Sequence, residues 1–297
     1  MIYTVTLNPS LDYVLQVDNL VKNCVNRSSA EQLIAGGKGL NVSIMLKNLG
    51  IQTVTLGFIA GFTGEKIREE VKKIGCIDEF IMLPKGLSRI NIKLKGSEET
   101  EINAQGPYIP EQSLNILFKK LAKLKDNDIL ILAGNAPSSL GNDIYAKIMS
   151  TLSDRNILTV VDASGEQLIK TLKYKPFLIK PNIHELSEVF NVPIETKEDI
   201  ILYAKKLCEL GAKNVIVSMD KRGAVMVCSE SEYYCKAKCI SAVNSTGAGD
   251  SMVAGFLAKY LESRDKKKAL SFAVATGTAA TSCMGFPTKE DIIALCE

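Results

Sequence analysis

Residues Asn244–Phe256 read Asn-Ser-Thr-Gly-Ala-Gly-Asp-Ser-Met-Val-Ala-Gly-Phe, and the apolar residues after the glycines recur at helical spacing. The glycines are therefore expected to form a turn that opens a buried helix. Such a turn directs free backbone N–H groups and the positive end of the helix dipole at an anion. A carboxylate adds little to anion binding, which favours a role for Asp250 as a proton acceptor. The alternative is a tight turn in which Asp250 only stabilises the helix dipole.

The composition is typical of an ordinary globular protein. The 297 residues suit one large α/β domain with an insertion, or two domains. The net charge of +3 is too small to indicate a nucleic-acid partner. The segment Met1–Leu7 predicts a core strand rather than a signal peptide, and no stretch is long and apolar enough to span a membrane.

Cysteine and histidine usage excludes several classes of site. The eight cysteines are scattered without a C-x-x-C pair, and His184 is the single histidine, which argues against a zinc site and a Ser-His-Asp hydrolase. A disulfide framework is not expected at this length. We therefore expect reduced thiols and a cytoplasmic protein.

From residue 111 onward, predicted helices and strands alternate. The helices are expected at Glu111–Leu124, Gly141–Leu152, His184–Phe190 and Lys197–Leu210. The strands are expected at Asp128–Ala133, Ile157–Asp162, Phe177–Lys180, Asn214–Met219 and Ala224–Cys228, after an earlier strand at Thr53–Ala60. This alternation predicts a parallel sheet covered on both faces, with ligands bound beyond the carboxyl ends of its strands.

Two regions predict a smaller sheet beside the main one. Tyr13–Val17 and Val25–Ile34 are polar strand candidates, and Leu87–Ile102 alternates, with Ile90 and Ile92 facing one way and Asn91 and Lys93 the other. We interpret the last as a two-faced antiparallel strand paired with the earlier two. The predicted division is a core of residues 1–11, 35–86 and 105–297 and a β lid of residues 12–34 and 87–104.

A second glycine-rich turn, Gly36-Gly37-Lys38-Gly39, precedes a helical pattern and contains a cation. It is neither a Walker A loop nor G-x-G-x-x-G, and a flexible surface turn is the alternative. In Lys180-Pro181-Asn182-Ile183-His184-Glu185, both Asn182 and Glu185 could reach a hydrated Mg²⁺. The alternative is a helix capping box, which does not exclude a metal role. Arginine suits a phosphate, although a lone Arg27, Lys38 or Arg89 is more often a surface charge.

Four stretches together resemble the ribokinase-like (PfkB) carbohydrate kinases, and within them the phosphosugar kinases. They are Thr6–Asp12, Gly36–Val42, Lys180–Glu185 and Asn244–Phe256, in family order across nearly the whole chain. Their joint occurrence is far more specific than a single glycine turn. The resemblance implies a ribokinase-like, doubly wound, mostly parallel sheet with helices on both faces and a small β-sheet lid.

The resemblance also implies roles for individual residues. The catalytic base would be Asp250, and the anion hole would be formed by the N–H groups of Gly247, Ala248 and Gly249. Sugar hydroxyls would be held by Asp12, Gly37 and Asn41, and the substrate phosphate by Arg27, Lys38 and Arg89. Mg²⁺ would be placed by Asn182 and Glu185. The nucleotide would lie near Lys180, Asn182, Ser218 and Gly223, and the lid would form a homodimer interface.

The implied activity is ATP-dependent phosphorylation of a ketohexose monophosphate, with D-fructose 1-phosphate as the expected substrate and Mg²⁺ as cofactor. Phosphorylation of tagatose 6-phosphate or fructose 6-phosphate is the alternative. A nucleotide-sensing protein without catalysis would not need Asp250 and an intact glycine turn. A dinucleotide dehydrogenase is disfavoured because no G-x-G-x-x-G follows the first strand.

Overall fold

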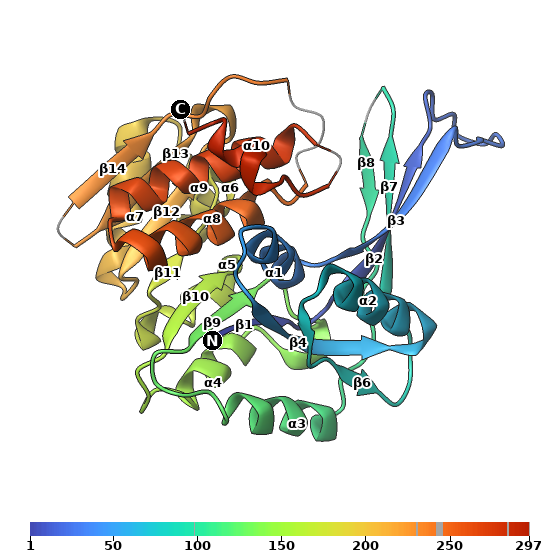
Figure 1. Cartoon of the computed structure of the whole chain (residues 1–297), viewed down its shortest axis with the longest axis horizontal. Coiled ribbons are helices and arrows are strands. Elements are labelled where there is room, and N and C mark those ends of the chain that lie inside the picture. The colour runs from blue at the N-terminus through green and yellow to red at the C-terminus, as the bar shows by residue number, and fades with distance from the viewer. Residues whose placement is uncertain (98, 230, 242–245, 284, 297) are drawn as a thin grey trace.

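The computed structural model describes residues 1–297 except 98, 230, 242–245, 284 and 297, so Asn244 and Ser245 of the predicted turn lie outside the described residues. The main sheet contains β1 (Ile2–Thr6), β4 (Thr53–Ala60), β5 (Ile77–Asp78), β6 (Ile81–Leu83), β9 (Ile129–Ala133), β10 (Leu158–Asp162), β11 (Leu178–Ile179), β12 (Asn214–Ser218), β13 (Ala224–Cys228) and β14 (Ser231–Cys235). Their order is β14-β13-β12-β11-β10-β9-β1-β4-β5, with β6 paired to β4 (Figure 1). The pairs from β12 to β5 are parallel, and β13 and β14 are antiparallel.

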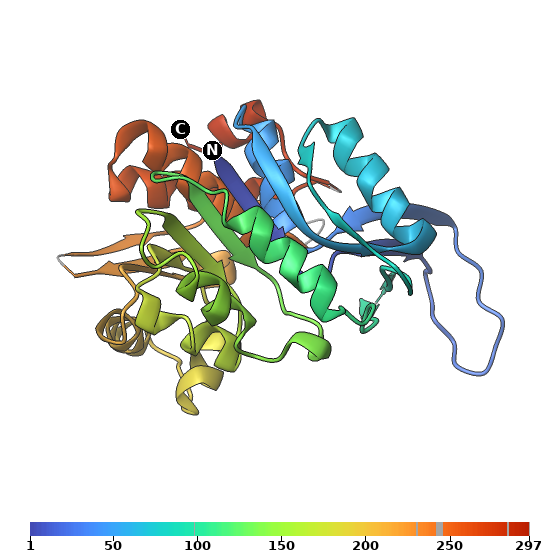
Figure 2. The ribbon, with the colours of Figure 1, turned by 90° about the horizontal axis from the view of Figure 1, so that it is seen from below.

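Helices cover both faces of this sheet (Figure 2). Side chains of β9 alternate between them, because Leu130 and Leu132 belong to one apolar core and Ile129 and Ile131 to another. The first core is closed by α3 (Glu111–Leu121), α4 (Ile144–Ser150), α5 (Gly165–Ile169), α6 (Ile183–Phe190) and α7 (Lys197–Glu209). The second is closed by α1 (Lys38–Asn48), α8 (Ala248–Ser263), α9 (Lys266–Thr281) and α10 (Lys289–Ile293). The predicted doubly wound fold is confirmed.

A second sheet of four strands forms the lid. Its order is β3 (Ala30–Gly36), β2 (Ser10–Gln16), β7 (Arg89–Lys95) and β8 (Thr100–Ile102), and it projects beside the main sheet in Figure 1. The prediction that the Leu87–Ile102 strand runs antiparallel to the earlier strands was wrong for its main partner, because β7 pairs in parallel with β2. The chain between β2 and β7 crosses the main body instead of making a hairpin, and such crossovers yield parallel pairs.

The alternation along β7 was predicted correctly, but its polar side is the more buried one. Asn91 and Lys93 are 5% and 7% exposed, whereas Ile90 is 39% exposed. Part of the apolar side is covered by α2 (Gly61–Ile74), whose Ile67 and Val71 share a core with Leu11. The polar side of the lid therefore faces the rest of the molecule.

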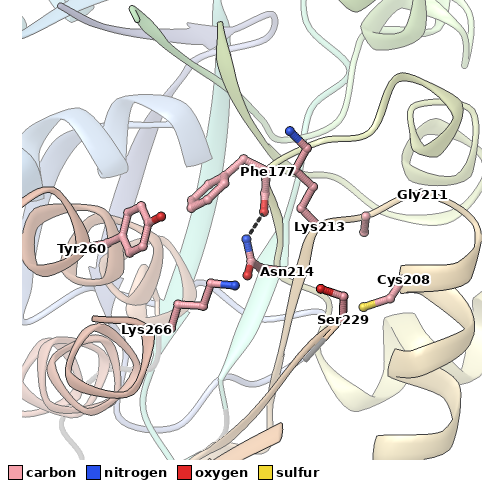
Figure 3. A pocket seen from close by; sticks show the side chains of 9 residues that line it. Phe177, Cys208, Gly211, Lys213, Asn214, Ser229, Tyr260 and Lys266 are labelled. Atoms are coloured by element: carbon pink, nitrogen blue, oxygen red, sulfur yellow. Dashed lines mark hydrogen bonds between the residues drawn. The ribbon is translucent and has the colours of Figure 1, made fainter. Parts of the chain in front are cut away.

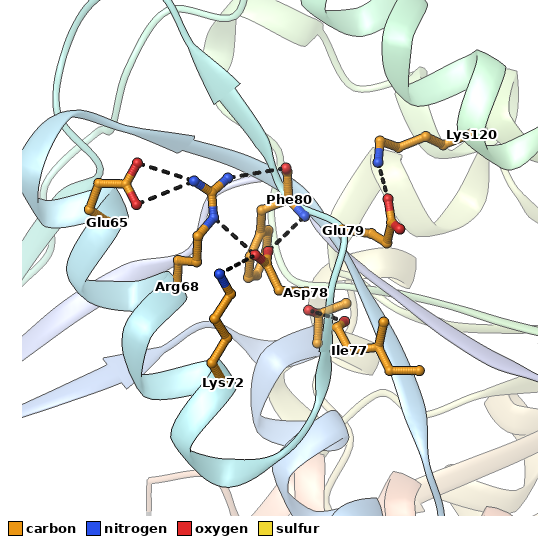
Figure 4. Close-up of polar contacts among 9 residues, drawn as sticks. Glu65, Arg68, Lys72, Ile77, Asp78, Glu79, Phe80 and Lys120 are labelled. Carbon is orange, nitrogen blue, oxygen red and sulfur yellow. Dashed lines mark hydrogen bonds and ion pairs between the residues drawn. The ribbon is translucent and has the colours of Figure 1, made fainter.

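Ion pairs attach α2 to the edge of the main sheet (Figure 4). Arg68 Nε lies 3.0 Å from Asp78 Oδ2 in β5, and Arg68 Nη1 lies 3.1 Å from Glu65 Oε1. Lys72 Nζ approaches the same Asp78 oxygen at 3.8 Å. Since α2 also packs under the lid, this network anchors the base of the lid to the core.

Most predicted boundaries lie within a few residues of the structure. The predicted β4 and β13 have the observed bounds, whereas the strand expected from Val25 begins at Ala30. Three short 3₁₀ helices complete the fold at Ser138–Leu140, Leu172–Tyr174 and Asp220–Arg222. Among the described residues, no helix combines the length and apolarity needed to cross a bilayer, and the cysteines form no disulfide.

Candidate active site

The N-terminus of α8 carries the predicted catalytic residues. Gly247 caps the helix in the left-handed conformation (φ 80°), and Asp250 in the first turn is only 6% exposed. A Cβ on Gly249 would lie 3.0 Å from Lys180 Nζ, so the lysine ammonium lies directly at the helix end. The first-turn N–H groups of Gly247, Ala248 and Gly249 together with this ammonium make a site suited to an anion.

The second glycine turn brings α1 to the same place. Gly37 caps α1 with φ 122°, and a Cβ on it would lie 2.7 Å from Thr6 Cγ2 at the end of β1. This close approach directs the start of α1 towards α8. Asn41 Nδ2 then donates a 2.7 Å hydrogen bond to Asp250 Oδ2, across 209 residues of sequence.

Two lysines and two carboxylates lie beside this pair. Lys38 Nζ is 3.2 Å from Asp162 Oδ1 and 3.6 Å from Glu185 Oε1, and Lys180 Nζ is 3.6 Å from Asp162 Oδ2. Burial opposes ionisation of Asp162, but the two lysines hold its pKa below the usual value. In turn, Asp162 is the largest cause of the raised pKa of Lys38. Lys38 and Asp162 are therefore both charged at neutral pH.

Asp250 has the properties of a general base. Burial is the main cause that raises its pKa to about 6, and the negative charge of Asp162 adds to it. Lys38, the hydrogen bond from Asn41 and Lys180 act in the opposite direction. A base with a pKa close to the working pH is ionised and still accepts a proton readily.

The Asn182–Glu185 pair forms the capping box that was the alternative reading. Asn182 Oδ1 accepts a hydrogen bond from Glu185 N at 2.8 Å, and Glu185 Oε2 accepts one from Asn182 N at 2.9 Å. Glu185 Oε1 remains directed at Lys38, and the buried Asp162 Oδ2 has no hydrogen-bond partner among the described residues. Within the described chain, no group of three or more acidic, His or Cys side chains is arranged so that it could hold a metal ion. Two carboxylates nevertheless fit Mg²⁺, which keeps several waters and takes substrate phosphates as ligands.

The inner face of the lid carries a buried ion pair around Asp12. Asp12 Oδ1 accepts hydrogen bonds from Ser10 Oγ at 2.7 Å and Asn91 Nδ2 at 2.9 Å, and Oδ2 lies 2.9 Å from Lys93 Nζ. A cavity of about 80 Å³ separates this face from α8, and its lining includes Asp12, Gly36, Asn41, Lys93 and Gly247. Asp12 and Asn41 thus face the same space.

Of the remaining predicted residues, some lie beside the site and others do not. Arg89, at the start of β7, is half-buried and donates from Nε to Asn8 O at 3.1 Å, and Ser218 bridges to Asn182 at the strand ends. Arg27 is exposed in the loop between β2 and β3, which extends far from the core in Figure 2, and the fold does not bring it to Asp250. The need for glycine at position 223 has a structural reason, because a Cβ there would lie 2.0 Å from the backbone oxygen of Cys235.

Two residues of the site were not among the predicted ones. Asp162 carried a usable signal, since it ends a predicted buried strand where ligands bind in such sheets. No such signal existed for Lys93 in the sequence, because alternation along a strand does not show which of its two faces turns towards the protein core.

The model of the pfkB family carbohydrate kinases matches residues 5–291 of the chain. The chain belongs to this family. The chain is 43% identical to a 1-phosphofructokinase from Bacillus subtilis, over 98% of this chain and 95% of the relative. It is 33% identical to a D-tagatose-1-phosphate kinase from Bacillus licheniformis, over 98% of this chain and 96% of the relative. It is 34% identical to a tagatose-6-phosphate kinase from Staphylococcus epidermidis, over 93% of this chain and 91% of the relative. Its fold also matches phosphofructokinase-2 from Escherichia coli in complex with substrates and products, with a TM-score of 0.94, 26% identity and coverage of 99% and 98%.

As a pfkB kinase, the protein is a phosphotransferase that uses ATP to phosphorylate a carbohydrate. The ribokinase-like fold with a lid sheet, expected from the sequence, is confirmed by the architecture and by these structural matches.

Proposed function

We propose that this kinase transfers the γ-phosphoryl group of ATP to the free primary hydroxyl of D-fructose 1-phosphate and forms fructose 1,6-bisphosphate. The observation that carries the proposal is the buried Asp250 at the N-terminus of α8, hydrogen-bonded to Asn41. The choice of sugar rests on the 43% identity to a 1-phosphofructokinase over nearly the whole chain.

In the proposed reaction, Asp250 takes the proton of the attacking hydroxyl while the oxygen bonds to the γ-phosphorus and ADP leaves. Catalysis of phosphoryl transfer is mostly positioning and stabilisation of charge. The N–H groups at the start of α8 and the ammonium of Lys180 stabilise the charge of the transferred group. Lys180 is suited to this role because it lies next to Gly249.

The phosphosugar is proposed to lie between the lid and α8. Asp12, Gly37 and Asn41 hold its hydroxyl groups, and Lys38 and Arg89 hold its phosphate. The support is that Asp12 and Asn41 line one cavity and that Arg89 begins the lid strand beside it. Arg27 remains a proposed phosphate contact that the folded single chain does not support. A closed lid would exclude water, which competes with the sugar as acceptor.

We propose that Glu185, Asn182 and the newly found Asp162 hold Mg²⁺ through oxygen ligands and water. When bound, the ion would neutralise phosphate charge. Lys180, Ser218 and Gly223 are the proposed border of the nucleotide site. We also propose that residues 12–34 and 87–104 form a lid distinct from the core, because these segments contain most of the second sheet.

A homodimer through the lid is also proposed. The outer face of the lid carries the exposed apolar residues Leu33, Ile90 and Ile102, at 44%, 39% and 56% exposure. Strand alternation puts Tyr13 and Ile92 on this face too, since each pairs in register with a neighbour there. An apolar sheet face of this kind is typical of an association surface.

The substrate is tested by measuring kcat/KM with fructose 1-phosphate, fructose 6-phosphate, tagatose 1-phosphate and tagatose 6-phosphate. We expect the highest value with fructose 1-phosphate. The names of the two tagatose kinases among the relatives favour tagatose phosphates as the second candidate. A higher kcat/KM with any other sugar of the panel would overturn the proposed substrate, and ATP consumption with none of them would overturn the proposed class of acceptor.

A further inference from the structure

Figure 3 shows a second cavity, of about 390 Å³, whose lining does not include Asp250. Phe177 lies just before β11, and Asn214 is the first residue of β12. The active-site residues Lys180 and Ser218 lie at the opposite ends of these two strands. Tyr260 lines the cavity from α8, ten residues after Asp250, which is about 15 Å along a helix axis. The volume lies in the range of small-molecule sites.

Asn214 is the clearest sign of a ligand in this cavity. It is 1% exposed, and its Nδ2 donates to Phe177 O at 2.6 Å (dashed in Figure 3). Its Oδ1 is buried and accepts no hydrogen bond from the described residues. A buried acceptor without a donor is costly and is rare in native proteins. A donor group on a bound molecule would satisfy it.

The charge of the lining favours an anion. Lys266, the first residue of α9, extends its ammonium towards the Asn214 amide in Figure 3, and Lys213 also lines the cavity. None of the lining residues within the described part of the chain is acidic. Burial raises the pKa of Cys208 to about 11, so this lining thiol is neutral at physiological pH.

The other walls add an apolar surface and a hydroxyl group. The rings of Phe177 and Tyr260 lie with their centroids 5.0 Å apart, and Ser229 contributes its hydroxyl at the exposed side. An ammonium, a hydroxyl and an unpaired amide oxygen together fit a molecule with one anionic group and at least one O–H donor. Phosphate esters of small polyols have this chemistry.

We propose that this cavity binds a small hydroxylated anion and is an effector site of the kinase. An occupant would contact the starts of β11 and β12 and the C-terminal end of α8, and at their other ends the same three elements position Lys180, Ser218 and Asp250 in the active site. Binding there can therefore shift the position of catalytic groups without blocking the substrate. The kinetic part of the proposal rests on the proposed function, but binding is measured without turnover.

The binding experiment uses a local fluorescent reporter. The chain contains no tryptophan, so Tyr260→Trp introduces a single indole into the cavity wall. Titration with glycerol 3-phosphate should give a saturable change in its fluorescence. Adding Lys266→Met should raise the dissociation constant about tenfold or more, because a charge-assisted contact is lost. Lys267→Met is the matched control, since Lys267 is exposed, adjacent and outside the cavity, and it should have no such effect.

Inorganic sulfate is the second probe. It offers an anion without any O–H donor, so it should bind more weakly than glycerol 3-phosphate. Equal binding of the two probes would overturn the role of Asn214 Oδ1 as the acceptor of a ligand hydroxyl. No saturable signal, or the same effect of Lys266→Met and Lys267→Met, would overturn the site. A crystal of the unaltered chain soaked with glycerol 3-phosphate gives an independent check, because the site requires density between Asn214 and Lys266.

Kinetics test the effector role. Glycerol 3-phosphate should change kcat or KM of the unaltered kinase but not of Lys266→Met. Competitive inhibition that persists in Lys266→Met would mean that the probe acts at the phosphosugar site, and binding without any kinetic change would refute the effector role. If no sugar is phosphorylated at all, the proposed function fails while the fluorescence result still decides the cavity.

Discussion

Lys93 Nζ lies 2.9 Å from Asp12 Oδ2, and both side chains are buried on the inner face of the lid. An ion pair out of water persists only with good geometry and further hydrogen bonds, which Ser10 and Asn91 supply to the other oxygen of Asp12. The pair therefore fixes the orientation of the carboxylate that is proposed to bind sugar hydroxyls. Lys93 is in this view a positioning residue for the substrate site.

Lys93→Met should raise KM for the phosphosugar by about tenfold or more, because the buried Asp12 carboxylate loses its partner. The effect on kcat should be smaller. Lys22→Met is the comparison: Lys22 is exposed in the loop between β2 and β3 and does not line the cavity, so its loss should leave KM unchanged. Equal effects of both variants on KM would contradict the role of Lys93.

Asp250→Asn should lower kcat by about 10²–10⁴-fold, the usual contribution of a positioned general base. Stability should not fall at neutral pH. Because burial raises the pKa of Asp250 to about 6, above the ordinary value, its ionised form is less favourable in the folded than in the unfolded chain at pH 7. Steady-state rates and thermal unfolding measure the two effects, and a nearly normal kcat would exclude Asp250 as the base.

The main sheet could be predicted because its strands are buried on both faces. β9 is a continuous apolar run, β4 is mostly apolar, and a glycine follows each strand. The two glycine turns were recognisable for a related reason, since both immediately precede a helical pattern. Local signals of this kind predicted the sheet and the two glycine turns, whereas the roles of most site residues were implied by the family resemblance.

What could not be predicted depends on contacts between distant segments. The inward face of β7, and with it Lys93, follows from parallel pairing with β2 through a long crossover. Asp162 acquires its importance from Lys38 and Lys180, which come from other elements. The prediction for Arg27 relied on the family resemblance alone, and the fold leaves this residue exposed and away from Asp250.

The pH dependence of kcat should show an acidic limb near pH 6. Asp250 accepts a proton only when ionised, so kcat falls as the pH drops through its pKa of about 6. Asn41→Ala removes a hydrogen bond that lowers this pKa, and the limb should move to higher pH. The shift between the two enzymes is the decisive readout, because a sugar phosphate itself titrates at about pH 6. Coincident limbs would mean that kcat does not report Asp250.

Glu185→Gln should increase the Mg²⁺ concentration for half-maximal activity by about tenfold or more. The amide oxygen of glutamine can still accept the capping hydrogen bond from Asn182 N, so the fold of α6 should survive. Glu188→Gln, on the exposed side of the same helix, is the control and should leave the Mg²⁺ dependence unchanged. A Mg²⁺ titration that does not distinguish the two variants would limit Glu185 to the capping box.

Leu33→Glu should convert the proposed lid dimer into a monomer, as measured by size-exclusion chromatography with light scattering. Leu33 is 44% exposed and pairs in register with Tyr13, which in turn pairs with Ile92, so a charge there lies in the middle of the outer apolar face. Packing by α2 reaches only Leu11 and Ala35 at the base of the same strands and leaves this part uncovered.

Leu202→Glu provides the control for this last change. Leu202 is 50% exposed on α7, on the main body and not on the lid, so the added charge is the same but the proposed interface is untouched. We expect this variant to have the mass of the unaltered protein. A monomeric unaltered protein at micromolar concentration, or dimers that persist in Leu33→Glu, would show that the outer face of the lid is not the association surface.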